Sequence, residues 1–171
     1  MKNILFVALI ILIFSACHKN TNQDYQNPLV FKDGILYQDS LSSKPFTGRN
    51  KSKMLDMVIE YEVVDGLKQG DFITYYPNGK VQMYGSMKQN KNVGLWKYYY
   101  QNGVLESSGY FNNDLPDSTW QWYNISGKLF EEGNYIGGKR NGTWKNYDSL
   151  GKLYTIKTYL DGTLKDSIKV D

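Results

Sequence analysis

Apolar and polar residues alternate along most of the chain in short runs, and polar turns that contain glycine separate these runs. The clearest run is GLWKYYYQNG, which begins at Gly94, and similar runs begin at Gly70, Ser118 and Gly142. Evenly spaced starts, 24 residues apart, indicate a true repeat, since a fixed period of about 20–50 residues is typical of repeat architectures. The pattern predicts five units, of which the first is divergent: 48–69, 70–93, 94–117, 118–141 and 142–165.

Alignment of the units at this period gives columns of one residue type. We expect two aromatic columns to form the repeat core and a glycine column to form the turns. The members are Phe72, Trp96, Trp120 and Trp144; Tyr75, Tyr99, Tyr123 and Tyr147; and the turn glycines Gly79, Gly103, Gly127 and Gly151. A further glycine column holds Gly85, Gly109 and Gly133 and is broken by Lys157.

The local chemistry of each unit predicts a β-hairpin. Aromatic and β-branched residues favour strands, and glycine-containing pairs such as Asn102–Gly103 favour tight turns. Strand, turn and strand would fill about 18 residues, followed by a polar connection such as 89–94 or 113–118. Because a single hairpin is marginal in water, the units must stack. The predicted fold is all-β: an elongated, open antiparallel sheet of stacked hairpins with an N-terminal signal helix, in which Trp96 lies near Trp120.

Atypical segments are expected to cap the two ends of this stack. Residues 30–37 carry an Asp-Gly hairpin signal, and Met57–Val64 is the predicted strand of the divergent first unit. At the other end we expect residues 166–171 to form the cap, with Ile168 in the tryptophan column.

The tryptophan and tyrosine columns lie three residues apart, so that in a regular strand they point to opposite faces. One row would then pack the interior, and the other would lie on the surface, where aromatic rings can stack on sugars or anchor protein partners. The alternative is that both rows are core.

The G-x-W-x-x-Y-x-x-x-G core of these units resembles the MORN repeat family, in particular its bacterial YwqK-like variant, over about residues 48–166. Phe72, Ser118 and Lys157 depart from that pattern. The resemblance implies a stacked-hairpin scaffold or binding surface. In some bacteria the YwqK-like variant carries the label of a toxin–antitoxin antitoxin, so the resemblance also implies an inhibitor as the alternative function.

The N-terminus has the pattern of an exported lipoprotein. Residues 4–14 are eleven consecutive apolar residues, too few for a span that needs about 20 but typical of an export signal. Ser15-Ala16-Cys17 resembles a lipobox. We therefore predict a signal peptide over 1–16, lipid attachment at Cys17, a flexible tether over 17–28 and a repeat domain over 29–171. An ordinary cleaved signal with a free cysteine and an uncleaved anchor are the alternatives.

Charge and residue types exclude several classes of function. The chain has 20 basic and 17 acidic residues, and removal of the signal peptide takes away only Lys2, which leaves 19 − 17 = +2 and no basic face for nucleic acid. Cys17 and His18 are the only cysteine and histidine, so we expect no metal site and no cofactor. The pairs Glu60/Glu62 and Glu131/Glu132 could in principle cleave glycosides, but a solvated sheet face explains them more simply, and we expect no catalytic residue.

The sequence thus predicts a non-enzymatic repeat protein of the bacterial cell envelope, held at the membrane, which we expect to be the outer membrane, through a lipid on Cys17. Its expected partner is a protein or a cell-wall glycan. An antitoxin or immunity-like inhibitor of a toxin that arrives at the envelope is the alternative. The oligomeric state and the side of the membrane that the domain faces stay open at this stage.

Overall fold

The computed structural model describes residues 25–170, and every regular element among them is a β-strand. The signal peptide, Cys17 and most of the predicted tether lie outside the described residues. The strands are β1 (Val30–Lys32), β2 (Ile35–Tyr37), β3 (Gly48–Met54), β4 (Met57–Val64), β5 (Leu67–Tyr75), β6 (Val81–Lys88), β7 (Lys91–Tyr99), β8 (Leu105–Asn112), β9 (Leu115–Tyr123), β10 (Leu129–Ile136), β11 (Lys139–Tyr147), β12 (Leu153–Leu160) and β13 (Thr163–Lys169).

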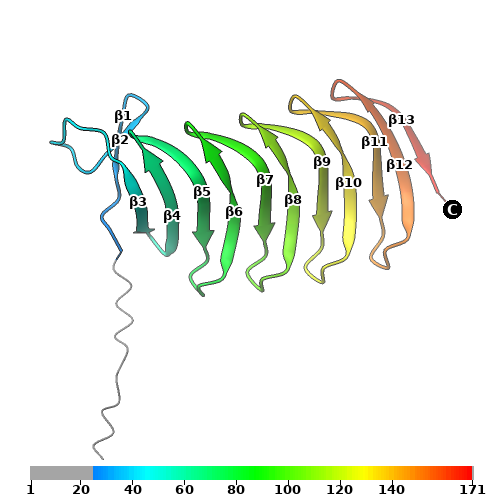
Figure 1. Ribbon diagram of the computed structural model, residues 1–171. Helices are drawn as coiled ribbons and strands as arrows, with labels where there is room; N and C mark the ends of the chain where they lie inside the picture. Colours follow the sequence, from blue (N-terminus) through cyan, green and yellow to red (C-terminus); the bar gives the residue numbers. More distant parts are fainter. Residues whose placement is uncertain (1–24, 171) are drawn as a thin grey trace, which may run out of the picture.

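Eleven of these strands form one antiparallel sheet in strict chain order, from β3 to β13, and β1 and β2 form a separate two-stranded sheet. Figure 1 shows the eleven strands side by side in a bent, open ribbon, with β3 and β13 at opposite ends. Ten strand spacings of about 4.8 Å give a ribbon roughly 50 Å long. The predicted elongated, open antiparallel sheet of stacked hairpins is therefore confirmed.

Each unit contains two turns, and the predicted polar connection between units is wrong. At the lower edge in Figure 1 the chain turns through residues 76–80, where the N–H of Gly79 donates to the Tyr76 carbonyl oxygen at 2.9 Å. At the upper edge the turn is only Gln89–Asn90, whose φ angles of 50° and 66° fit a type I′ hairpin. The rest of the predicted connection, residues 91–94, belongs to β7. Units therefore join by strand pairing without a break.

The first residue of each of the four regular units, which begin at residues 70, 94, 118 and 142, sits at a β-bulge. The register between β4 and β5 shifts where Gly70 lies, and Gly70, Gly94 and Gly142 have φ angles of 73°, 70° and 68°. Glycine accepts this left-handed conformation without a steric cost, which explains the column. Ser118 occupies the same position with φ of 58°, so this one unit carries a strained residue at its bulge.

Hydrogen bonds between successive upper turns stabilise the stack. Asn90 donates its N–H to the Lys68 carbonyl oxygen at 3.0 Å, and its Oδ1 accepts from the Lys68 N–H at 2.7 Å. Asp114 makes the same pair of bonds with Asn92 one unit later. The next position in the series is Pro116, which has no N–H to donate, and its partner is Gly138, which has no side chain to accept. The backbone bond also joins Gly162 to Arg140, so it recurs along the stack, whereas the side-chain bond is made at Asn90 and Asp114 only among the described turns.

The N-terminal end is closed by extra segments. The N–H of Leu36 in β2 donates to the Gly66 carbonyl oxygen at 2.9 Å, which ties the predicted Asp-Gly hairpin to the upper turn of the first unit. Gln26 bridges to Ser52 of β3 in parallel, and its N–H donates to the Lys51 carbonyl oxygen at 2.8 Å. Gln26, which the sequence assigns to the tether, thus contacts the first strand of the large sheet.

The C-terminal end differs from the predicted cap. The register shift between β12 and β13 skips one residue, whereas the shift between β8 and β9 skips two. As a result Ser167 pairs with Lys157, which is the position that Trp120 occupies when it pairs with Gly109. Ile168 pairs instead with Ile156. The expectation that Ile168 continues the tryptophan column was wrong, and its side chain is 54% exposed.

Candidate binding surface

One face of the sheet carries a continuous row of aromatic rings, here called the aromatic face. Trp96, Trp120 and Trp144 are its buried centre, with exposed fractions of 2%, 6% and 0%. No second layer is needed to bury them, because the rings cover one another. Other ring members are half-buried: Tyr61, Phe72, Tyr98, Phe111, Trp122, Tyr135 and Tyr159.

We expected tryptophans of neighbouring units to contact one another, but a residue from outside the tryptophan column lies between each pair. Tyr98 lies between Trp96 and Trp120, with ring centroids at 6.4 Å and 6.3 Å from them. Trp122 occupies the same position one unit later and lies 5.8 Å from Trp120 and 5.5 Å from Trp144. Trp122 therefore belongs to the row, although the sequence columns left it out.

The glycine column Gly85, Gly109 and Gly133 exists because of these tryptophans. Each indole lies across the glycine of a neighbouring strand, where an added Cβ would overlap the ring of Trp96, Trp120 or Trp144. Lys157 breaks the column on β12, and the strand beyond it carries no tryptophan to lie over that position. The glycines are thus required by close packing and not by backbone conformation.

The opposite face, here called the polar face, is defined by one row of cross-strand neighbours. The row is Lys51, Glu60, Ile73, Tyr84, Lys97, Ser108, Gln121, Glu132, Lys145 and Ile156. The predicted tyrosine column lies beside it: Tyr75 and Tyr147 bond the carboxylates of Glu60 and Glu132. The structure thus places the two aromatic columns on opposite faces, with the tyrosines half-buried.

Glu132 is the centre of a hydrogen-bonded cluster in the last units. It accepts from the Tyr147 hydroxyl at 2.7 Å and from Gln121 at 3.2 Å, and its Oε1 lies 3.6 Å from the Lys145 ammonium. The bond from Tyr147, with those from Gln121 and Lys145, holds the pKa of Glu132 below its usual range despite partial burial. Burial and the bond to Glu132 raise the pKa of Tyr147 to about 12.

Three of the four carboxylates that the sequence offers for glycoside cleavage have ion-pair partners, and the fourth, Glu62, is exposed. Burial opposes ionisation of Glu60, but Arg49 and Lys51 pair with it and hold its pKa below the usual range. Glu131 pairs with Arg140, whose guanidinium lies 3.9 Å above the Trp144 ring on the aromatic face. Glu131 and Glu132, adjacent in a strand, point to opposite faces, so they do not form an acid–base pair.

The polar face contains an apolar pocket of about 400 Å³ over β5–β7, close to the lower turns. Ile73, Val81, Tyr84 and Tyr99 line it, with Lys80 and Gly103 at its edge. The exposed fraction of Tyr84 is 39%, and its hydroxyl donates to Asp71 Oδ1 at 3.3 Å. Sequence columns could not find this pocket, because Ile73 and Tyr84, which distinguish it, have different residues at their positions in the other units, although Tyr99 and Gly103 belong to constant columns.

Residues 25–170 offer neither a membrane-spanning helix nor a cluster of metal ligands. In that part of the chain no helix is long and apolar enough to cross a membrane. The same residues contain no group of three or more histidine, cysteine or acidic side chains that could hold a metal ion.

A family model described as "MORN repeat variant" matches three stretches of the chain, residues 68–89, 92–113 and 140–161. The matches keep the 24-residue phase, and the intervening stretch from Pro116, which contains Ser118, is not among them although its strands are the same. No curated protein sequence matches the chain at a significant level. Three stretches of the chain thus match the MORN repeat variant, and all three lie within the hairpin stack described above.

Proposed function

We propose that this protein is a non-enzymatic binding scaffold of the bacterial cell envelope, held at the membrane by a lipid on Cys17, and that it binds its partner on the polar face. One observation carries the proposal. The central column of the aromatic face is repeated almost unchanged, whereas the central row of the polar face varies: Phe72, Trp96, Trp120 and Trp144 are all aromatic, and the residues that follow them on the polar face are Ile73, Lys97, Gln121 and Lys145.

This difference separates a structural surface from a recognition surface. The tryptophan column must stay constant because each indole packs against the rings and the glycine of its neighbours. The polar face is free to vary because its side chains face solvent and leave the sheet hydrogen bonds intact. A single-layer sheet roughly 50 Å long thus offers an extended, chemically varied surface, as stacked repeats do when they bind partners.

An affinity pull-down from detergent-solubilised envelope tests the binding function, with the soluble form that starts at His18 as bait. The test variant is Lys97→Glu with Ser108→Glu, two neighbours on the polar face. The matched control is Lys91→Glu with Gln101→Glu, at the two turn edges, which makes the same change in charge. We expect the partner to be lost with the test variant only. Equal capture by both variants would contradict the proposal, and a captured toxin would identify the inhibitor function.

Lipid attachment is tested separately with the full chain. Cys17→Ser should abolish the incorporation of radiolabelled fatty acid and release the protein from the membrane fraction. Equal labelling of the wild-type chain and the variant would exclude Cys17 as the attachment site.

A further inference from the structure

We propose that the pocket formed by Ile73, Val81, Tyr84 and Tyr99 is the specificity site of the polar face, and that it binds an extended peptide of a protein partner. The peptide carries an apolar residue for the pocket, with a basic residue on one side of it and an acidic residue on the other. This inference rests on the proposed function and assigns the site and the chemistry of the partner.

The pocket has the chemistry of an apolar side-chain receptor. Its walls are two tyrosine rings and two aliphatic side chains, and the Tyr84 hydroxyl points away to Asp71. A volume of about 400 Å³ is within the range of small-molecule pockets and is ample for one leucine, methionine or phenylalanine side chain. A sugar ring would require polar groups that converge on the pocket, and the one cation at its edge, Lys80, donates to the Asn102 carbonyl oxygen.

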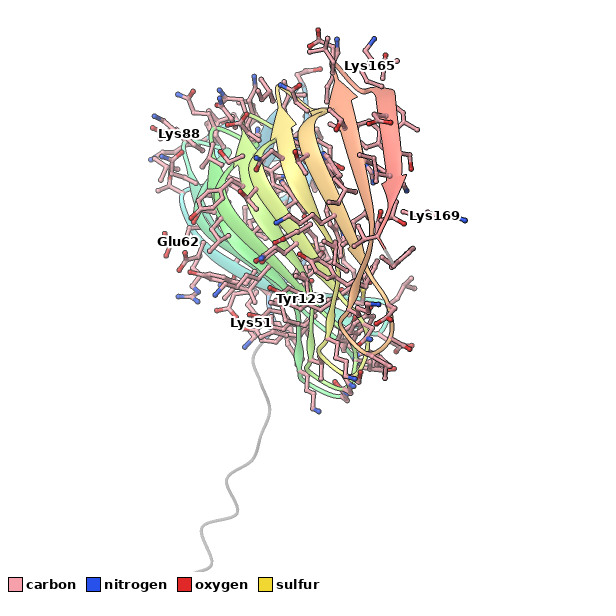
Figure 2. All side chains as sticks on the ribbon, turned by 90° about the vertical axis from the view of Figure 1, so that its right-hand side faces the viewer. Lys51, Glu62, Lys88, Tyr123, Lys165 and Lys169 are labelled. Atoms are coloured by element: carbon pink, nitrogen blue, oxygen red, sulfur yellow. The ribbon has the colours of Figure 1, made fainter. Side chains whose placement is uncertain are left out.

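Charges of opposite sign flank the pocket. Glu62 and Asp71 are exposed on the β4–β5 side, and neither makes an ion pair within residues 25–170, because Arg49 pairs with Glu60. In Figure 2 Glu62 projects from the left-hand side of the sheet, as Lys51 does. On the β7 side Lys97 stands directly across from Tyr84, and no described carboxylate pairs with it.

This combination occurs in one unit only. At the position of Ile73 the other units have Lys97, Gln121 and Lys145. At the position of Tyr84 they have Glu60, Ser108, Glu132 and Ile156. No other unit pairs an apolar residue at the first position with an aromatic residue at the second, so the pocket is a specialisation within a repetitive scaffold.

The strand spacing sets the order and separation of the residues in the partner. Asp71 on β5 and Lys97 on β7 are two strands apart, or roughly 10 Å across the sheet. An extended peptide advances about 3.3 Å per residue, so a peptide that crosses the strands covers this distance in about three residues. The predicted motif has a basic and an acidic residue three or four positions apart, with an apolar residue between them.

Selection from a display library of random twelve-residue peptides tests the inference, with the full chain purified in detergent as the target. The variants are Tyr84→Ala, which removes a pocket wall, and Glu62→Gln with Asp71→Asn, which removes the acidic side. Tyr154→Ala is the matched control, because Tyr154 is an exposed tyrosine on β12, five strands beyond β7 and away from the pocket. Circular dichroism of each variant verifies the fold, and chitotetraose serves as the glycan probe.

We expect selected peptides to share the basic–apolar–acidic motif and to bind the control as they bind the wild type. Tyr84→Ala should weaken this binding tenfold or more, and the Glu62/Asp71 variant should weaken it several-fold and reduce its dependence on salt. No shared motif, unchanged binding to folded Tyr84→Ala, or chitotetraose binding that requires Tyr84 would overturn the inference. If the pull-down partner is lost with the Lys97/Ser108 variant but retained by Tyr84→Ala, the proposed function stands and this inference fails.

Discussion

Replacement of Gly109 by alanine tests how the aromatic face is built. Gly109 lies on β8 outside the left-handed region, so alanine meets no backbone strain there. In an ordinary strand the substitution would stabilise the fold by roughly 0.5–1 kcal/mol, because glycine loses more entropy on folding. Here the new Cβ would overlap the Cδ2, Cε2 and Cγ atoms of Trp120, well inside the roughly 3.5–4.0 Å at which carbon atoms pack.

The Trp120 ring has no free space into which it can move. Phe111 lies 5.2 Å from it on one side and Trp122 5.8 Å on the other, between ring centroids, and the indole N–H is fixed to the Tyr110 carbonyl oxygen at 3.0 Å. We therefore expect Gly109→Ala to expel the ring and to cost about 3–5 kcal/mol, the usual loss for a buried aromatic side chain. For a domain of this size that corresponds to a fall in Tm on the order of 10 °C.

A double-mutant cycle measured by urea unfolding separates this mechanism from a general intolerance of Gly109. In the Trp120→Ala background the added methyl group has room, so Gly109→Ala should then change the free energy of unfolding by less than about 1 kcal/mol. A loss of the same size in both backgrounds, or a stabilised single variant, would refute the ring-over-glycine packing.

Three further predictions concern the same scaffold. Trp120→Ala should cost about 3–5 kcal/mol and Trp122→Ala clearly less, since Trp120 is 6% exposed and Trp122 is half-buried; equal shifts in urea midpoint would contradict this. Ser118→Gly should raise stability by about 0.5–1 kcal/mol because it relieves a left-handed serine, and an unchanged or lower Tm would count against strain at the bulge. Tyr147→Phe should cost about 1 kcal/mol and raise the pKa of Glu132 toward its ordinary value of 4.5. The folded pKa of Glu132 is lowered, so its contribution is present above pH 4.5 and is lost as the pH falls through the folded value; the variant should therefore lose less stability in acid than the wild type, and an identical pH profile would exclude this bond as the cause.

The period and the residue columns predicted the architecture because each column has one dominant physical role. Tyr99 and Trp96 are three residues apart in a strand, which placed them on opposite faces before any coordinates were known. Strand β4, predicted as Met57–Val64, has those bounds in the structure. Such columns are visible in the sequence because the same local environment recurs in every unit and requires the same residue type.

Features that depend on register could not be predicted in the same way. The bulge at Gly70 and the two-residue turn at Gln89–Asn90 convert the expected loop into paired strand. The bulge between β12 and β13 contains one residue fewer than the bulge between β8 and β9. Ser167 therefore takes the position that was expected for Ile168. Trp122 lies outside the sequence columns because its equivalents, Thr74, Tyr98 and Asn146, share no residue type, although all of them face the aromatic row.

The candidate site was the least predictable part, for a physical reason. Ile73 and Tyr84 are 11 positions apart in sequence and become neighbours only through the β5–β6 pairing. Their positions hold different residues in every other unit, so no column marks them. The repeat pattern identifies the scaffold, whereas the proposed recognition site is marked by Ile73 and Tyr84, which depart from the pattern.

The central claim, that partners bind the polar face, is tested most directly by site-specific photo-crosslinking in cells that produce the full chain. A benzophenone amino acid is placed at Ser108 or Lys97 on the polar face, and at Gln101 or Lys91 at the turn edges. The account predicts one shared crosslinked species from the two polar-face positions and none from the two edge positions. Crosslinks from the edge positions with none from the polar face would contradict it.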